Sequence, residues 1–231
     1  MRRCLARTSF SLCAALLGTA PVHAADLSSA TTKPASKTPQ WTLSIEGSPE
    51  FYAIDNGSNR AGNLDDSYYK LGLSYRFSDD LLGGVSFQHS FKAKGGVQYY
   101  AEATLGYKFK LSDAFSLTPS IGAGYTWDDT GIISGANTNA DIGYYVLYLA
   151  GDLKVTSKLT WNAFNLRYRN GFDATWETPK VATGFTYDFD AYNAVYLNAG
   201  YAWKRLETSR PPYDELAGDK YNIALGYKRA F

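Results

Sequence analysis

Large apolar residues alternate with small or polar residues in successive segments from Trp41 to the end of the chain. In residues 97–109, for example, Tyr99 and Leu105 share one face and Glu102 lies on the other. Successive side chains of a strand point to opposite faces, so a period of two predicts β-strands. No sustained 3.6-residue period occurs in this part of the chain. The pattern therefore predicts an all-β protein.

The alternation divides into ten segments, which predict ten strands. The segments are residues 41–54, 69–77, 85–91, 97–109, 115–127, 145–153, 159–168, 181–189, 195–203 and 221–231. Pro119 within the fifth segment predicts a bulge or a register break. The one-residue phase slip between Ala163 and Phe164 predicts a β-bulge. Eight or twelve strands are the alternatives, because strand boundaries are the least determined part of such a pattern.

The connections between these segments alternate in length. The short ones are residues 78–80, 111–114, 156–158 and 190–193, the long ones are residues 56–67, 128–141, 170–180 and 205–218, and residues 92–96 are intermediate. Short turns on one side and long loops on the other are typical of a transmembrane barrel. The expected fold is thus an antiparallel up-and-down transmembrane β-barrel.

Outward-facing aromatic residues gather at two levels of the predicted barrel. One level contains Trp41, Phe77, Phe109, Phe115, Trp161, Phe189 and Phe231, and the other contains Tyr69, Phe91, Tyr99, Trp127, Tyr145, Tyr168, Trp203 and Tyr221. Aromatic girdles mark the two interfaces of a membrane with water. Outer-membrane lipid and lipopolysaccharide are therefore expected partners.

The last segment ends on an aromatic residue. Its apolar face is formed by Tyr221, Ile223, Leu225, Tyr227 and Phe231. This pattern resembles the closing strand of bacterial outer-membrane β-barrel proteins, and no narrower family is indicated. The resemblance implies that these five residues are the signal read by the barrel-assembly machinery. Arg229 departs from the pattern, but a long basic side chain can reach the interface from that position. For this segment alone, the edge strand of a soluble β-sandwich is the alternative.

The first residues have the features of a secretory signal peptide. Residues 1–24 combine three early arginines, an apolar middle and the small-residue cleavage site Val22-His23-Ala24. Residues 25–40 are small, polar and interrupted by prolines, which predicts a flexible periplasmic leader before a barrel of residues 41–231. Both cysteines, Cys4 and Cys13, fall within the signal, so the exported chain has neither a disulfide nor a cysteine-ligated metal.

Composition narrows the class further. The formal charge of +1 falls to about −2 when the three signal arginines are removed, which gives no support for nucleic-acid binding. Nineteen Tyr and twelve Phe occur in a chain whose mean hydropathy is −0.29. An aromatic outer belt around a polar lumen accounts for that combination.

The inward face of the predicted strands carries more bases than acids. The candidate pore-lining residues are Lys70, Arg76, Glu102, Lys108, Asp152, Arg167, Arg169, Asp188 and Lys204. A wall of one sign attracts permeating counter-ions, which favours a small porin-like channel for small polar or anionic solutes. The alternative is a salt-bridged plug in a non-conducting structural or adhesive barrel that displays its loops. The pattern does not predict an oligomeric state.

The search for a catalytic or metal site yields no candidate residue, and no cofactor is expected. Omptin proteases use an Asp-His pair facing an Asp pair, whereas the exported chain contains one histidine, His89. A surface hydrolase using His89 and Ser90 is a distant third hypothesis, because adjacent strand residues point to opposite faces. Asp65 and Asp66 are expected to keep an outer loop solvated. The alternative is that they hold a divalent cation.

Overall fold

The computed structural model describes residues 40–55, 60–93, 96–128, 142–173, 175–203, 205–207 and 219–231. The predicted signal peptide, and all but the last residue of the predicted leader, lie outside the described residues. None of the described residues forms a helix long and apolar enough to cross a membrane.

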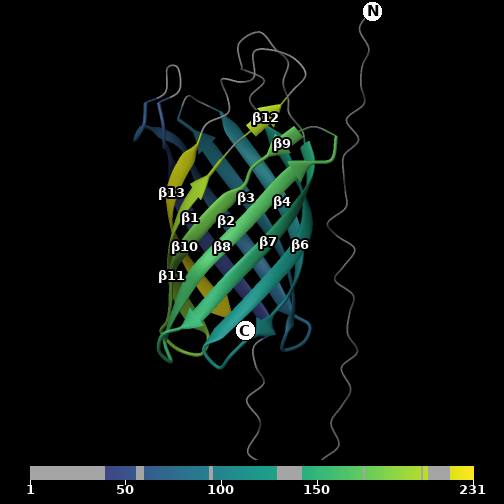
Figure 1. The fold of residues 1–231 in the computed structure, drawn as a ribbon, viewed down its shortest axis with the longest axis vertical. Helices are drawn as coiled ribbons and strands as arrows, with labels where there is room; N and C mark the ends of the chain where they lie inside the picture. Colours follow the sequence, from purple (N-terminus) through teal and green to yellow (C-terminus); the bar gives the residue numbers. More distant parts are fainter. Residues whose placement is uncertain are drawn as a thin grey trace, which may run out of the picture. The chain divides into compact units, whose positions relative to one another are not determined.

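Thirteen strands occur in the described residues (Figure 1). They are β1 (Trp41–Tyr52), β2 (Leu64–Arg76), β3 (Leu81–Lys92), β4 (Val97–Tyr107), β5 (Phe109–Lys110), β6 (Phe115–Asp128), β7 (Ile142–Lys154), β8 (Leu159–Gly171), β9 (Thr175–Glu177), β10 (Lys180–Asp188), β11 (Asn193–Ala202), β12 (Arg205–Glu207) and β13 (Lys220–Ala230). All strand pairs are antiparallel, and β4 and β5 continue one another against β6. The sheet therefore closes into a barrel of ten strands, which confirms the predicted fold and strand count.

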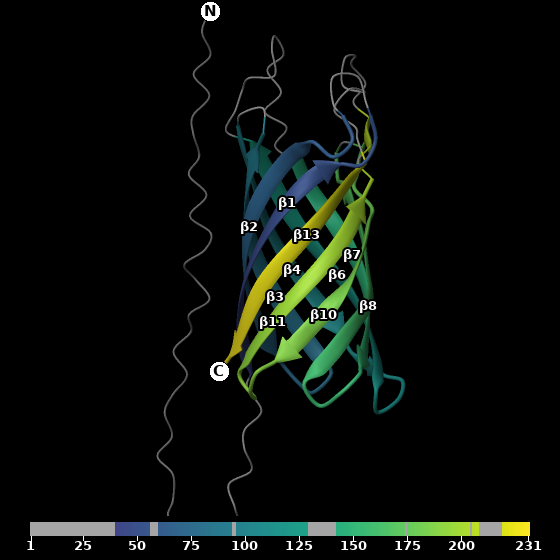
Figure 2. The ribbon, with the colours of Figure 1, turned by 90° about the vertical axis from the view of Figure 1, so that its left-hand side faces the viewer.

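The first and last strands close the barrel. Figure 2 shows β1 and β13 side by side, and the main chains of Trp41 and Phe231 exchange hydrogen bonds of 3.1 and 2.9 Å. A path from paired residue to paired residue around the barrel leaves β7 at Lys154 and returns to it at Ile142, twelve residues earlier. Such a displacement requires strongly tilted strands.

The structure resolves the two predicted irregularities in different ways. The β-bulge in β8 is confirmed, because the register with β7 and with β10 shifts by one residue around Ala163. The prediction at Pro119 was wrong, since β6 keeps a single register along β7 and along β4 and β5. Only the ladder between Tyr107 and Phe109 is interrupted opposite the proline, because proline has no N–H to donate.

Four short turns of one design lie at the end of the barrel that carries Phe231. They span residues 77–80, 111–114, 155–158 and 189–192. The side-chain oxygen at the second position accepts hydrogen bonds from the backbone N–H groups two and three residues later. These acceptors are Ser78, Ser112, Thr156 and Asp190. The turns thus satisfy their own polar groups locally.

At the opposite end, the long-loop end, the sequence prediction needs two corrections. β2 begins at Leu64, so Asp65 and Asp66 belong to a strand and not to an outer loop. Asp65 forms an ion pair with Lys220, and Asp66 is 6% exposed. Two short strands predicted as loop, β9 and β12, pair with each other. Segments of three residues are too short to show a period of two, so alternation does not predict them.

Candidate functional site in the barrel lumen

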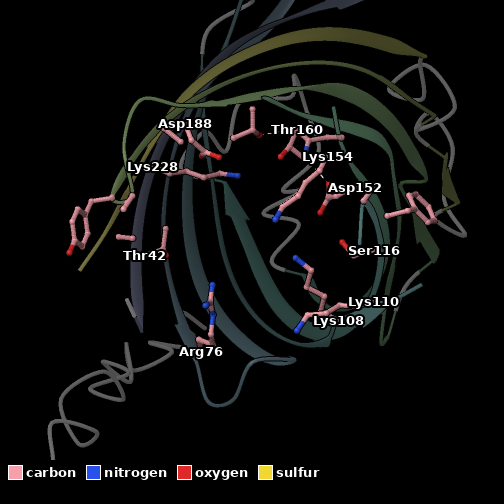
Figure 3. Close-up of a pocket in the computed structure, with 18 of the residues that line it drawn as sticks. Thr42, Arg76, Lys108, Lys110, Ser116, Asp152, Lys154, Thr160, Asp188 and Lys228 are labelled. Carbon is pink, nitrogen blue, oxygen red and sulfur yellow. Dashed lines mark hydrogen bonds between the residues drawn. The ribbon is translucent and has the colours of Figure 1, made fainter. Parts of the chain in front are cut away.

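The lumen opens at the short-turn end into a cavity of about 720 Å³, here called the vestibule. Figure 3 shows the side chains of Arg76, Lys108, Lys154 and Lys228 directed into this space. Its charged lining residues are Arg76, Lys108, Lys110, Lys154, Lys228, Asp113, Asp152, Asp188 and Asp190. Among the described residues, Lys110 is the one vestibule base with an ion pair within 4 Å, and its partner is Asp80. Arg76, Lys108 and Lys154 make no ion pair in the described part of the chain, and the Nζ atom of Lys228 lies 4.6 Å from the centroid of the Tyr196 ring.

Deeper in the lumen, Glu102 on β4 and Arg169 on β8 form a buried ion pair. An Nη atom of Arg169 lies 2.7 Å from Oε2 of Glu102, and its Nε donates to the same oxygen at 3.0 Å. The carboxylate also accepts hydrogen bonds from the hydroxyls of Tyr148, at 2.6 Å, and Tyr144, at 3.1 Å. The guanidinium lies over the rings of Tyr144 and Tyr100 at 5.1 and 5.6 Å. These five residues are named the Glu102 cluster.

The Glu102 cluster lies along one side of the barrel because a glycine on β6 leaves space for the Tyr144 ring against the wall. β6 and β7 separate β4 from β8, and Gly124 on β6 pairs with Tyr144 on β7. A Cβ atom at Gly124 would meet the Tyr144 ring carbon Cζ at 2.4 Å. The ring therefore lies flat over the glycine, against the wall. Tyr196 lies in the same way over its paired glycine, Gly226.

A second group of bases faces the lumen near this level without a carboxylate partner. Arg167 on β8 and Lys180 on β10 are paired residues of neighbouring strands, and both lie on the inward face. Lys70 on β2 is a third inward base, and its charge acts on both Lys180 and Glu102. In the described part of the chain, no carboxylate oxygen lies within 4 Å of these three bases. Arg167, Lys180 and Lys70 are named the open cationic group.

The predicted pore-lining residues divide among these three places. Arg76, Lys108, Asp152 and Asp188 line the vestibule. Glu102 and Arg169 form the buried pair, whereas Lys70 and Arg167 belong to the open cationic group. Lys204 lies outside the described residues.

Sequence reasoning missed part of the inner wall. The inward tyrosines were not proposed as lumen residues, although parity places them there; they are Tyr68, Tyr100, Tyr144, Tyr148 and Tyr196. Lys180 and Lys228 were also missed. Both positions could have been found by counting one residue back from the outward-facing Val181 and Arg229.

The residues of the predicted assembly signal face outward, away from the lumen. Their exposed fractions are 38% for Tyr221, 51% for Ile223, 63% for Leu225, 37% for Tyr227 and 59% for Phe231. An apolar face left uncovered over a whole strand fits contact with lipid.

His89 offers little to a hydrolase. Its Nδ1 lies 2.5 Å from the Tyr69 hydroxyl on the outer face, and its ring stacks on Tyr99 with centroids 4.6 Å apart. Ser90 is 1% exposed and lies on the inner face, where Gln88 donates to its hydroxyl. The two side chains are on opposite sides of the sheet. Among the described residues, no three His, Cys, Asp or Glu side chains are grouped as metal ligands.

One comparison with a known protein supports the fold. No protein-family model matches the sequence, and no curated protein matches it significantly. An outer-membrane channel from Pseudomonas putida F1 is similar over 87% of this chain and 100% of that chain, with 13% identity and a TM-score of 0.52. The KdgM porin in complex with disordered oligogalacturonate matches 81% of this chain and 99% of that chain, with 18% identity and a TM-score of 0.41.

Ail, the attachment invasion locus protein of Yersinia pestis, matches 84% of this chain and 99% of that chain, with 13% identity and a TM-score of 0.38. At such identities a likeness shows the fold alone. The closed ten-stranded barrel, together with the first of these likenesses, gives this chain the fold of the bacterial outer-membrane β-barrel proteins.

Proposed function

We propose that the protein is an integral outer-membrane channel for small anionic or polar solutes. The observation that carries the proposal is the excess of bases without ion-pair partners along the inner wall. They occur both in the vestibule and in the open cationic group. Charge of one sign in a low-dielectric wall focuses the electric field on permeating ions and favours those of opposite sign.

The inner wall also supports a narrow bore. Barrels of eight strands are filled by their own side chains, and ten strands enlarge the diameter only modestly. In this barrel, however, the large rings of Tyr144 and Tyr196 lie over glycines and not across the lumen. This arrangement supports a proposed path for small solutes on the side of the lumen away from the Glu102 cluster, and it gives no support for a wide general-diffusion pore.

Planar-bilayer recording tests the proposal. Refolded barrel beginning at residue 25 is inserted between solutions of unequal KCl concentration, and the reversal potential gives the ion preference. We expect small unitary currents with a preference for chloride over potassium, weaker at high salt because of screening. A barrel that stays silent under all salts, or that prefers potassium, would contradict the proposal.

A non-conducting barrel that displays its loops is the second candidate. The observation that favours it is the Glu102 cluster, which fills one side of the lumen. The side chains of its ion pair are only 4% (Glu102) and 7% (Arg169) exposed. Silence in the same recordings, together with a folded barrel, would select this candidate.

We further propose that the last strand is the assembly signal read by the barrel-assembly machinery. Its support is the outward apolar face that ends at Phe231, beside the closing strand pair. A chain ending at Ala230 is expected to accumulate less in the outer membrane, while Phe231→Tyr retains an aromatic terminus and serves as the control. Normal membrane levels of the shortened chain would rule the role out. Lipopolysaccharide remains a proposed partner of the aromatic level at the long-loop end.

A further inference from the structure

Arg167 and Lys180 stand beside each other on the inner wall. They are paired residues on β8 and β10, so their side chains leave the sheet next to each other on the same face. Two bases placed in this way repel each other unless an anion lies near them. The carboxylates whose charge acts on Lys180 are those of Glu50 and Glu46, and neither lies within 4 Å of it.

The hydrogen bonds of Arg167 are incomplete. Its Nη2 donates to the Thr178 carbonyl at 3.5 Å, which is a long contact. Its Nε is enclosed and has no hydrogen-bond partner. Enclosed polar groups in native proteins nearly always have a partner, so this donor could accommodate an acceptor that enters the lumen. The acceptor that suits a guanidinium is an oxyanion, which can engage two N–H groups at once.

The stem of Lys180 lies over a glycine of the neighbouring strand. A Cβ atom built at Gly200 of β11 would lie 2.7 Å from Cε of Lys180, so the lysine stem lies across this glycine. The absence of a side chain at Gly200 gives the lysine room to lie along the wall. Its Nζ makes no hydrogen bond or ion pair in the described part of the chain.

The same strand contains an internal example of the interaction that Arg167 lacks. Two residues further along β8 and on the same face, Arg169 holds the carboxylate of Glu102 at 2.7 Å. Arg167 has the same functional group on the same face of the strand, but no carboxylate of the described residues lies within 4 Å of it.

We propose that Arg167 and Lys180 form a binding station for the oxyanion group, carboxylate or phosphate, of a small solute in the lumen. This inference rests on the proposed channel function and deepens it, because it names the chemistry of the solute. The guanidinium supplies paired donors, and the ammonium supplies a compact charge from the neighbouring strand. Lys70 adds attraction from β2.

Isothermal titration of the refolded barrel in detergent tests the station directly. Succinate and inorganic phosphate are titrated separately into the wild-type barrel and into Arg167→Gln, Lys180→Gln and Lys158→Gln. Lys158 lies in a short turn outside the vestibule lining, so its substitution is a control that removes the same charge. We expect a loss of about tenfold or more in affinity for each lumen variant, as a charged hydrogen bond contributes, and no change for Lys158→Gln.

Two further variants separate the station from a general effect of charge. Gly200→Val retains every charge but displaces the lysine stem, so it is expected to weaken binding. Arg167→Lys retains the charge but lacks the planar donors, so it is expected to bind less tightly than wild type and more tightly than Arg167→Gln.

The outcomes distinguish this inference from the channel itself. Binding that depends on Arg167 in a barrel without current supports the station and removes the channel function. A conducting barrel whose binding of both ligands is unaffected by Arg167→Gln and Lys180→Gln overturns the station while the channel stands. Equal losses in Lys158→Gln would also overturn it, because the attraction would then be non-specific. Heat-dependent gel mobility verifies that each variant is folded.

Discussion

Arg167 and Arg169 lie two residues apart on the same strand and on the same face, yet their surroundings are opposite. Arg169 is 6% exposed, holds Glu102 in an ion pair and lies over two tyrosine rings. Arg167 has one long hydrogen bond and an orphaned Nε. The difference shows that a lumen charge can serve the fold or be available to a solute, and that residue type alone does not decide which.

The two arginines differ because the strands that flank β8, namely β7 and β10, present different side chains to them. On the β7 side, Tyr144 and Tyr148 help to hold Glu102, and Gly124 leaves room for the arrangement. On the β10 side, the paired residue of Arg167 is another base, Lys180. A partly buried charge without a partner is costly to keep, so we associate it with ligand binding.

The largest expected effect comes from breaking the buried pair. Arg169→Gln or Glu102→Gln leaves one charge buried and uncompensated, which costs about 3–5 kcal/mol. Urea-induced unfolding in lipid vesicles measures the loss. The double variant is expected to be more stable than the sum of the two losses predicts, because both charges are removed together. Additive losses would mean that the two residues are not coupled.

A side chain at Gly124 should disturb the same cluster through packing. Gly124→Val would displace the Tyr144 ring from the wall into the lumen, at a cost of about 1–3 kcal/mol in stability. Conductance should fall as well, because the bore narrows. Gly47→Val is the matched control, since a Cβ there meets nothing closer than a backbone oxygen at 3.9 Å. Equal conductance in the two variants would contradict the flat position of the ring.

Neutralising Arg167 should affect ion preference and not stability, the opposite of what is expected for Arg169. Arg167→Gln removes no ion pair, so its stability is expected to stay within about 0.5 kcal/mol of wild type. Its chloride preference in bilayers should nevertheless decrease, as the reversal potential reports. A loss of stability as large as that of Arg169→Gln would remove the distinction between the two arginines.

The smallest effect concerns Asp190, a turn residue at the rim of the vestibule whose carboxylate accepts several hydrogen bonds. In the turn 189–192, hydrogen bonds from the Asn193 side chain and the Tyr192 backbone hold the pKa of Asp190 below its ordinary value of 3.8. A lowered folded pKa gives stability that is present above the unfolded pKa and is lost as the pH falls through the folded pKa. Urea midpoints should therefore decline in acid below about pH 4.

Asp190→Ser tests this turn, since serine occupies the same position at Ser78 and Ser112. The variant should fold normally and lose only this part of the acid sensitivity. If the urea midpoint of the variant declined in acid as steeply as that of the wild type, the turn carboxylate would make no measurable contribution to the pH dependence of stability.

Much of the fold was predictable because its signals are local. Alternation assigned the inward and outward faces, and the phase slip at Ala163 located the bulge in β8. The four short turns also carry a readable pattern, with Ser, Thr or Asp at the second position. Pro119 was misjudged because a proline can interrupt hydrogen bonding at one point without shifting the register. Asp65 and Asp66 were misjudged because polar residues in a barrel strand can face a polar lumen.

The strand class, the number of barrel strands, the face of most strand side chains and the excess of bases on the inward face follow from a period of two along one chain, so they can be read from local sequence. Which of these charges are paired depends on contacts between strands that are distant in the chain. Glu102 and Arg169 are 67 residues apart and meet because β6 and β7 place tyrosines and a glycine between them. Arg167 remains open because its neighbouring strand presents Lys180, and that depends on register, which alternation alone does not specify.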